Sequence, residues 1–412
     1  MLETSLAKEK VKIVMLEGVH SSAIEAFRAD GYTNIEVHEK ALPEAQLVVA
    51  VRDSYLVGIR SATQLTRPVL EASDHLIAVG CFCIGTNQVD LETAQDHGIA
   101  VFNAPFSNTR SVAELVLAEI IMLLRGIPAR NAAAHRGRWL KNARGSREAR
   151  GKVLGIIGYG HIGTQVGVLA ESLGMQVVFY DIQRQLALGN ARQMANLDAL
   201  LEISDVVTCH VPQTPETNRM IDAAALAKMK KGAALINAAR GQVVDIDALT
   251  GALDSRHISG AALDVFPQEP ESIAEEFVSP LRGRDNVILT PHVGGSTQEA
   301  QHDIGIEVSS KLLKYSNNGS TLGAVNFPEV TLPAHPGQHR LLHIHCNQPG
   351  VLSQVNSILS QKGINIAGQY LQTNNRIGYV VIDIEAPERA VSMQLRKRLD
   401  QVAGTIRTRI LY

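Results

Sequence analysis

Short runs of apolar residues alternate with amphipathic stretches over most of this chain. The runs have the length of buried strands, and the stretches between them repeat apolar residues at helical spacing. In the first part of the chain, strands are predicted at 12–16, 35–37, 56–59, 76–79 and 100–102. In the middle part, they are predicted at 153–157, 177–180, 206–209, 233–236, 261–263 and 287–289. This alternation predicts an α/β protein with two doubly wound, Rossmann-like parallel sheets.

The pattern changes in the last part of the chain. Residues 317–336 are rich in Asn, Gly and Pro, which indicates a linker. The predicted elements after it are a strand at 340–346, a helix at 350–361, strands at 365–373 and 378–385, a helix at 388–399 and a strand at 405–411. This β-α-β-β-α-β order is ferredoxin-like. Because so small a sheet exposes an edge and a face, we expect a second copy to cover it.

Two helices are expected where the chain passes between the first two domains. Ser111 with Glu114, and Ser296 with Glu299, have the spacing of capping boxes at helix starts. The predicted domains are a discontinuous substrate-binding domain of residues 1–107 and 296–336, a dinucleotide-binding domain of residues 108–295 and a regulatory domain of residues 337–412.

A glycine-rich turn follows the predicted strand 153–157 and opens a helical pattern. Gly158 allows a tight turn, Gly160 lets the backbone approach a pyrophosphate, and Gly163 lets helix and strand pack closely. Asp181 ends the next strand, where its carboxylate would accept hydrogen bonds from a ribose diol and repel a 2′-phosphate. The turn therefore predicts a site for NAD rather than NADP, although a glycine-rich turn in an ordinary α/β domain is the alternative explanation.

Three side chains with complementary chemistry follow other strands of the same predicted sheet: Arg240, Glu269 and His292. Since ligands of such sheets bind beyond the carboxyl ends of the strands, we expect the three to converge. Arginine binds a carboxylate and polarises a carbonyl, histidine exchanges a proton near neutral pH, and a carboxylate behind the histidine stabilises its charged form. Singly, each could be a surface or turn residue; together they predict 2-hydroxy acid oxidation.

Composition limits the classes of partner and the cellular location that can be expected for this protein. The net charge of −2 gives no reason to expect nucleic acid or an anionic membrane as a partner, and no stretch is apolar and long enough to span a bilayer. The N-terminus lacks the apolar core of a signal peptide. The cysteines are too few for a disulfide framework and lack metal-like spacing, so a cytoplasmic protein without a metal is expected. They are Cys81, Cys83, Cys209 and Cys346.

Four segments together resemble the D-2-hydroxyacid dehydrogenase superfamily: G-Y-G-H-I-G (158–163), N-A-A-R-G (237–241), A-L-D-V-F-P-Q-E-P (262–270) and T-P-H-V-G-G-S-T (290–297). The resemblance implies that Arg240, Glu269 and His292 are the catalytic residues. Beyond the glycines and Asp181, it implies NAD contacts at His161, Ile162, Ala238, Ala239, Arg240, Asp264, His292, Val293, Gly294 and Gly295.

Further segments resemble the branch of that superfamily that oxidises 3-phosphoglycerate in the first step of L-serine synthesis. They are 80–90, 102–116 and 343–352. This branch implies substrate contacts at Arg60, Ser61, Asn108 and Lys141 as well as Arg240. Ala62 and Glu39 depart from its pattern of an arginine and a lysine, which leaves less positive charge for a phosphate. Another D-2-hydroxy acid, particularly 2-hydroxyglutarate, remains an alternative substrate, and a non-catalytic NAD-sensing regulator is an alternative function.

The tail resembles an ACT domain, a small amino-acid sensor. The resemblance implies that L-serine binds there as a feedback inhibitor, on a surface that pairs across a dimer. The candidate contacts are Asn347, expected at a helix start, and His345 and Asn365, expected near the ends of neighbouring strands. The resemblance also implies a homotetramer held through the ACT and NAD-binding domains. A dimerisation module without a ligand is the alternative for this tail.

Overall fold

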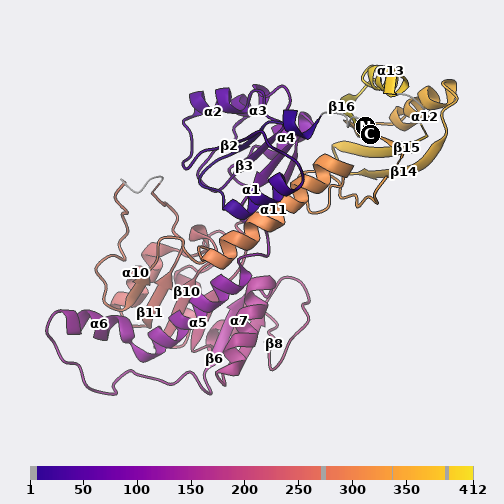
Figure 1. Cartoon of the computed structure of the whole chain (residues 1–412). Coiled ribbons are helices and arrows are strands. Elements are labelled where there is room, and N and C mark those ends of the chain that lie inside the picture. Colours follow the sequence, from indigo (N-terminus) through magenta and orange to yellow (C-terminus); the bar gives the residue numbers. More distant parts are fainter. Residues whose placement is uncertain (1–6, 271–274, 336, 386–388, 412) are drawn as a thin grey trace. The chain divides into compact units, whose positions relative to one another are not determined.

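The computed structural model describes residues 7–270, 275–335, 337–385 and 389–411 of the chain (Figure 1). Pro336 and Glu388, the predicted linker end and helix start, lie outside these residues, as do Met1 and Tyr412, the outermost residues of the predicted domains. The chain divides into two compact units. The first unit is Met1–Ser107 with Gln301–Tyr412, and the second is Asn108–Ala300.

The first unit contains a five-stranded sheet in the order β2-β1-β3-β4-β5, and every neighbouring pair is parallel. Its strands are β1 (Ile13–Met15), β2 (Ile35–Val37), β3 (Leu56–Ile59), β4 (Ala78–Cys81) and β5 (Ala100–Asn103). Its helices are η1 (Lys8–Lys10), α1 (Ser21–Ala29), α2 (Glu44–Val51), α3 (Arg67–Glu71) and α4 (Leu91–Asp96). Strand β4 begins later than the predicted 76–79, because the residues before it are buried as well and the apolar run cannot mark its start.

The second unit contains a seven-stranded parallel sheet in the order β12-β11-β10-β9-β6-β7-β8. Its strands are β6 (Val153–Ile157), β7 (Gln176–Tyr180), β8 (Arg192–Gln193), β9 (Val206–Cys209), β10 (Ala233–Asn237), β11 (Ile258–Leu263) and β12 (Val287–Leu289). Its helices are α5 (Thr109–Arg125), α6 (Ile127–His135), α7 (His161–Ser172), α8 (Leu197–Ile203), α9 (Ala223–Lys228), η2 (Gly241–Val243) and α10 (Ile246–Asp254). The strand order reverses between β6 and β9, which is where such sheets bind ligands.

The tail of the chain forms a second sheet in the first unit, antiparallel and in the order β14-β15-β13-β16. Its elements are β13 (His339–Cys346), α12 (Val351–Gln361), β14 (Ile366–Thr373), β15 (Ile377–Ile384), α13 (Arg389–Leu399) and β16 (Thr405–Leu411). The predicted fold class, two parallel sheets followed by a ferredoxin-like unit, is confirmed.

The tail sheet buries both of its faces within the first unit. Alternate residues of β13 and β15, such as Leu341 and Val380, pack with α12 and α13, while Leu342 and Tyr379 join a core shared with β1 and with α11 (Gln298–Asn318). The face that we expected a second copy to cover is therefore covered by the same chain. Strand β14, at the sheet edge, keeps most of its residues exposed or half-buried.

Both predicted capping boxes were wrong. Helix α5 begins at Thr109, so Ser111 lies inside it, where its hydroxyl is 2.7 Å from Thr297 Oγ1. Helix α11 begins at Gln298, and Thr297 rather than Ser296 accepts the hydrogen bond from the helix, at 3.2 Å from the Ala300 amide. The spacing of the motif also occurs within a first helical turn, and only backbone geometry distinguishes the two. No helix within the described ranges is both long and apolar enough to cross a membrane.

Candidate active site

The three glycines of the predicted nucleotide turn have different surroundings. Gly158 has a φ of +89°, and a Cβ there would lie 2.6 Å from the His210 carbonyl oxygen. A Cβ on Gly163 would lie 2.1 Å from the carbonyl oxygen of Gly158, so helix α7 packs directly on the turn. A Cβ on Gly160 would meet nothing within 4 Å. Gly158 and Gly163 allow the turn to form, and Gly160 leaves the outer surface of the turn open.

The open surface lies at the N-terminus of α7. Gly160 caps this helix without a side-chain hydrogen bond, and His161 and Ile162 form its first turn. Asp181, after β7, is held by the backbone: its Oδ2 accepts from the Tyr159 amide and its Oδ1 from the Gln183 amide, both at 2.9 Å. A helix N-terminus beside a fixed carboxylate fits the pyrophosphate and ribose of a dinucleotide.

His292 and Glu269 form a hydrogen-bonded pair. His292 Nδ1 donates to Glu269 Oε2 at 2.8 Å, and the other glutamate oxygen accepts from the Phe266 amide at 3.0 Å. The hydrogen bond that His292 donates to Glu269 raises the pKa of His292 above its usual value. Burial alone would raise the pKa of Glu269, but the hydrogen bonds from His292 and Phe266 and the charge of Arg240 outweigh it, so this pKa is lowered. The imidazole is thereby oriented, and its Nε2 is left for a substrate.

Arg240 follows β10 and is positioned by a buried asparagine. Asn237 Nδ2 donates to the Arg240 carbonyl at 3.0 Å, and Asn237 Oδ1 accepts from the Ala239 amide at 3.1 Å. The next residue, Gly241, packs so closely that a Cβ would lie 1.9 Å from the carbonyl carbon of Phe266. The loop that carries Arg240 is therefore pressed against the loop that carries Glu269. Ala238 lies in the same short segment.

Asp264 anchors the loop that carries His292. Its Oδ1 accepts from the Val293 amide at 2.8 Å and its Oδ2 from the Gly294 amide at 2.8 Å. The backbone of His292 has a φ of +53°, an uncommon value for a residue with a side chain. The His292 amide donates to the Asp264 carbonyl at 2.8 Å, and this hydrogen bond helps to stabilise the conformation. The structure thus brings Arg240, Glu269 and His292 together at the carboxyl edge of one sheet.

The predicted substrate residues are distributed over both units. Asn108 lies in the second unit beside Gly295, where an added Cβ would come within 2.3 Å of Asn108 Nδ2. Its buried side-chain oxygen has no hydrogen-bond partner among the described residues. Lys141 lies in the same unit, exposed in the segment between α6 and β6. Arg60 and Ser61 follow β3 in the first unit.

The sequence reasoning missed Glu17, which organises the loop after β3. Its carboxylate accepts hydrogen bonds from the amides of Arg60, Ala62 and Thr63 at 3.0, 2.9 and 2.8 Å. Its own φ of +62° was not visible in the pattern of apolar residues. Asn237 was missed for the same reason, since its role depends on a loop and not on spacing.

The predicted effector residues do not meet within one chain. His345 is paired with Gly378 at one end of the tail sheet, and Asn347 follows it, with its Nδ2 donating to the Asn374 carbonyl at 2.8 Å. Asn365 precedes β14, whose first residue, Ile366, pairs with Ile384 at the other end of β15. The expectation of neighbouring strands was wrong, because β15 lies between β13 and β14.

Comparison with known proteins places this geometry in a family. Residues 117–294 match the model of the D-isomer specific 2-hydroxyacid dehydrogenase NAD binding domain, and residues 341–407 match an AHAS small subunit-like ACT domain. D-3-phosphoglycerate dehydrogenase of Escherichia coli (strain K12) is 60% identical over 412 residues, which are 100% of each chain. The chain belongs to the D-3-phosphoglycerate dehydrogenase family.

A second curated relative and a solved structure extend the match. D-3-phosphoglycerate dehydrogenase 1 of Saccharomyces cerevisiae is 49% identical over 414 residues, covering 98% of this chain and 88% of the relative. Among solved structures, D-lactate dehydrogenase from Aquifex aeolicus, in complex with NAD and lactic acid, superimposes with a TM-score of 0.68 at 27% identity, covering 77% of this chain and 100% of that one. The chain is thus an NAD-dependent D-2-hydroxyacid dehydrogenase, as the sequence predicted.

Proposed function

We propose that this enzyme oxidises 3-phospho-D-glycerate to 3-phosphooxypyruvate with NAD, as the first step of L-serine biosynthesis. The observation that carries the proposal is the 2.8 Å bond between His292 and Glu269, beside Arg240. The full-length similarity to enzymes named for this substrate supports it.

Each of the three residues has one role in the proposed reaction. Arg240 binds the substrate carboxylate through its planar guanidinium, with two parallel hydrogen bonds. His292 Nε2 takes the proton of the C2 hydroxyl in oxidation and returns it in reduction. Glu269 stabilises the imidazolium formed in between. Bound NAD supplies the acceptor for the hydride of C2, and the turn at 158–163, Asp181 and the loops at 238–240, 264 and 292–295 hold it.

The substrate phosphate needs cations beyond Arg240. We assign its binding to Arg60, Ser61, Asn108 and Lys141. Three backbone amides, including that of Arg60, donate hydrogen bonds to the Glu17 carboxylate and so position the loop of Arg60. Ala62 and Glu39 stand where the pattern of the resembling branch has an arginine and a lysine. Fewer positively charged groups are therefore available here to hold the phosphate.

We further propose three functional domains with the boundaries predicted from sequence, and L-serine as an inhibitor bound by the tail. Because His345 and Asn347 lie at one end of the tail sheet and Asn365 at the other, the proposed serine site takes residues from two copies of the chain. We also propose a cytoplasmic homotetramer, held through the ACT and NAD-binding domains; the shared serine site supports the contact through the ACT domains.

The test is NADH oxidation by the purified enzyme with 3-phosphohydroxypyruvate or with 2-oxoglutarate, each with and without L-serine. We expect the phosphorylated substrate to have the higher kcat/KM and serine to inhibit both reactions. A higher kcat/KM for 2-oxoglutarate would contradict the proposed substrate and make Ala62 and Glu39 specificity determinants. Insensitivity to serine would contradict the regulatory assignment alone. Asn365→Ala separates effector binding from catalysis: we expect it to lose inhibition by serine and to keep the activity measured without serine. Asn356→Ala on α12 is the control, and we expect it to keep both.

A further inference from the structure

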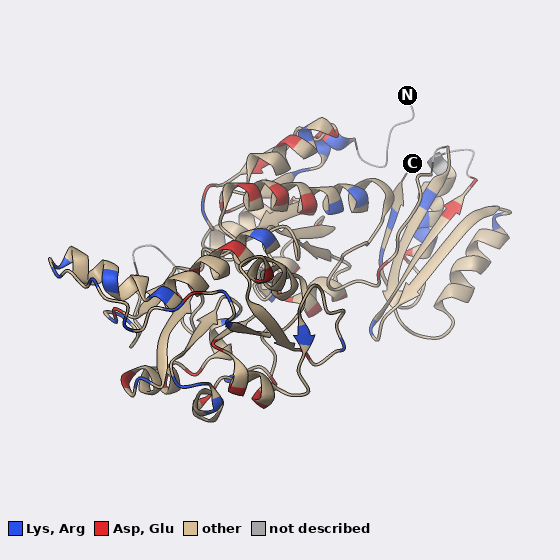
Figure 2. Cartoon of the chain, turned by 90° about the horizontal axis from the view of Figure 1, so that it is seen from below, with Lys and Arg blue, Asp and Glu red and all other residues tan. Residues whose placement is uncertain are grey.

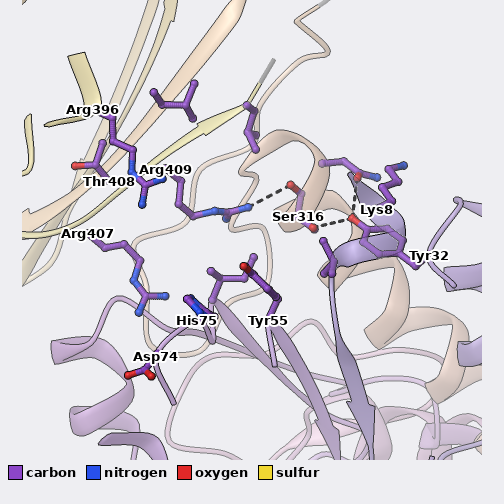
Figure 3. Close-up of a pocket in the computed structure, with 15 residues that line it drawn as sticks. Lys8, Tyr32, Tyr55, Asp74, His75, Ser316, Arg396, Arg407, Thr408 and Arg409 are labelled. Carbon is purple, nitrogen blue, oxygen red and sulfur yellow. Dashed lines mark hydrogen bonds between the residues drawn. The ribbon is translucent and has the colours of Figure 1, made fainter. Parts of the chain in front are cut away.

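A cavity of about 380 Å³ lies in the first unit between the parallel sheet and the tail. One wall consists of residues from the loops before β3 and β4, and the other consists of residues from β16 and α13 (Figure 3). This volume falls in the range of small-molecule sites, about 300–1,000 Å³. None of the residues assigned to substrate, cofactor or serine lines it.

Three arginines line this cavity: Arg396, Arg407 and Arg409. Arg407 and Arg409 are two residues apart on β16, so their side chains leave the same face of the strand. In Figure 3, Arg407 points toward Asp74 and His75, and Arg409 points toward Ser316. Basic residues are visible along the tail strands in Figure 2 as well. Arg396 approaches from helix α13.

These cations are poorly neutralised. Arg407 Nη1 donates to the Leu76 carbonyl, and Arg409 Nη2 donates to the Ser316 carbonyl at 3.3 Å, so both partners are uncharged. Arg409 Nη1 is buried and has no hydrogen-bond partner in the described part of the chain. Burial and the charges of Arg409 and Arg396 lower the pKa of Arg407 despite the opposing effect of Tyr315.

The acidic groups nearby do not balance the charge. Asp74 is the acidic residue among those that line the cavity, and no salt bridge within 4.0 Å joins it to Arg407 or Arg409 among the described side chains. Arg396 makes a long contact of 3.9 Å with Asp400 on its own helix turn. Lys8 also lines the cavity, but its ammonium is paired with Asp30 at 2.7 Å. Arg407 and Arg409 are half-buried, and partly desolvated guanidinium groups without carboxylate partners favour an anion between them.

The remaining walls limit the size and shape of that anion. Tyr55 and His75 stack with ring centroids 5.3 Å apart and planes 7° apart, and form a flat surface opposite β16. Val11, Ile77 and Leu411 are apolar. The guanidinium groups offer several N–H donors in a planar fork, which suits the three oxygens of a phosphate.

We propose that this cavity is a binding site for a small phosphate dianion, either inorganic phosphate or a phosphate monoester, distinct from the active site. The ligand would bridge β16 of the tail to the loop before β4, in which Leu76 already accepts a hydrogen bond from Arg407. Its binding therefore adds contacts between the tail and the parallel sheet of the same unit.

The test is calorimetric titration of the full-length enzyme with inorganic phosphate, glycerol 3-phosphate and malonate at constant ionic strength. The variant is Arg396→Gln combined with Arg409→Gln, and Arg398→Gln on the same helix is the matched control. We expect the double variant to lose one phosphate-binding event per chain, or to weaken it about tenfold or more, since charge-assisted hydrogen bonds are the stronger class. The control keeps the event, and all three proteins keep NADH oxidation within about twofold.

Two further variants guard against a change in folding. Arg396→Gln alone alters an exposed helix position, and Arg409→Lys retains the charge. We expect the first to weaken binding and the second to retain most of it. Tighter binding of glycerol 3-phosphate than of phosphate would identify a monoester as the ligand, and equal binding would identify phosphate. Identical titrations of wild type and the double variant, or tighter binding of malonate, would overturn the proposal.

Discussion

At the scale of single residues, the proposed active site depends on one charged hydrogen bond. Glu269 accepts from His292 Nδ1, and this bond raises the pKa of the imidazole. In the proposed mechanism, oxidation needs neutral His292 as a base, and reduction needs protonated His292 as an acid. The raised pKa therefore extends reduction to higher pH and requires higher pH for oxidation.

Glu269→Gln tests this relation. We expect the pKa of His292 to fall, so that reduction is lost at lower pH and the acid limb of oxidation also moves to lower pH. We expect kcat/KM to drop by at least about tenfold, because the imidazolium loses its counter-charge. Complete pH profiles in both directions measure the shift. Glu276→Gln, at an exposed salt bridge with Arg282, is the control; pH limbs that stay in place in Glu269→Gln would contradict the assignment.

A second carboxyl group in the same unit is buried without a partner. Glu119 on α5 is 0% exposed, and neither of its oxygens has a hydrogen-bond partner among the described residues. Burial, together with the charge of Asp264, raises its pKa to about 8. The folded protein therefore keeps Glu119 protonated in a range where the unfolded chain ionises it. Its contribution to stability is complete at low pH and is lost progressively as the pH rises to about 8.

Glu119→Gln should remove this dependence, because glutamine is neutral at every pH. Relative to wild type, we expect the variant to gain a few kcal/mol in free energy of unfolding between about pH 5 and pH 8. Urea unfolding at both pH values measures the difference. The control is Glu114→Gln, on the same helix but 58% exposed, for which we expect little change with pH. A constant difference between Glu119→Gln and wild type would mean that Glu119 is ionised in the folded state.

At the scale of elements, the nucleotide turn joins β6 to α7 with almost no free space. A Cβ at Gly163 would overlap the Gly158 carbonyl, whereas one at Gly251, within α10, would meet nothing within 4 Å. A side chain would therefore be excluded at Gly163 and tolerated at Gly251, although both glycines lie in helices of the same unit. The first is required for packing, and the second lowers helix stability through its backbone entropy.

The two alanine variants should accordingly change stability in opposite directions. We expect Gly163→Ala to lower the free energy of unfolding by about 1–3 kcal/mol through overpacking, and to weaken NAD binding because the turn is displaced. We expect Gly251→Ala to raise it by about 0.5–1 kcal/mol with NAD binding unchanged. Thermal unfolding and NAD titration of both variants provide the measurement. A stable Gly163→Ala with normal NAD affinity would mean that the turn can relax.

At the scale of the whole molecule, the tail is built into the first unit. One core cluster includes Ile13 near the start of the chain, Val308 in α11 and Leu411 at the end. A buried ion pair strengthens this junction: Arg340 donates to both oxygens of Asp383 at 2.6 and 2.7 Å, and to the carbonyls of Asn318 and Pro333 at 3.0 and 2.9 Å. The pair connects the tail sheet to the segment that leads into it.

Asp383→Asn would leave the buried guanidinium of Arg340 without its counter-charge. We expect it to destabilise the first unit by about 3–5 kcal/mol, with any unfolding transition of the second unit unchanged. Scanning calorimetry resolves the transitions. Asp198→Asn removes a pair with Lys228 that is largely exposed, and we expect a cost below about 1 kcal/mol. Equal effects of the two substitutions would show that burial of the Arg340 pair has no energetic consequence.

The sequence alone determined the features that depend on local rules. Apolar periodicity located the strands other than β8, because burial imposes it on each strand separately. Strand β8 consists of the two polar residues Arg192 and Gln193, so it has no apolar run and was not predicted. The glycine turn and the positions of Arg240, Glu269 and His292 after three strands followed from the same logic. The fold class was predictable for this reason. The hydrogen bond between His292 and Glu269 is consistent with the prediction that the two residues follow neighbouring parallel strands.

Only the tertiary structure decided which distant side chains meet. The support that Asn237 and Asp264 give to the catalytic loops depends on loop conformations that no periodicity encodes. The separation of Asn365 from His345 depends on the order of strands in a sheet. The cavity between the parallel sheet and β16 gathers residues far apart in the chain, and its unbalanced charge arises when packing partly shields Arg407 and Arg409 from water. These features depend on packing between elements, for which the sequence of each element carries no local signal.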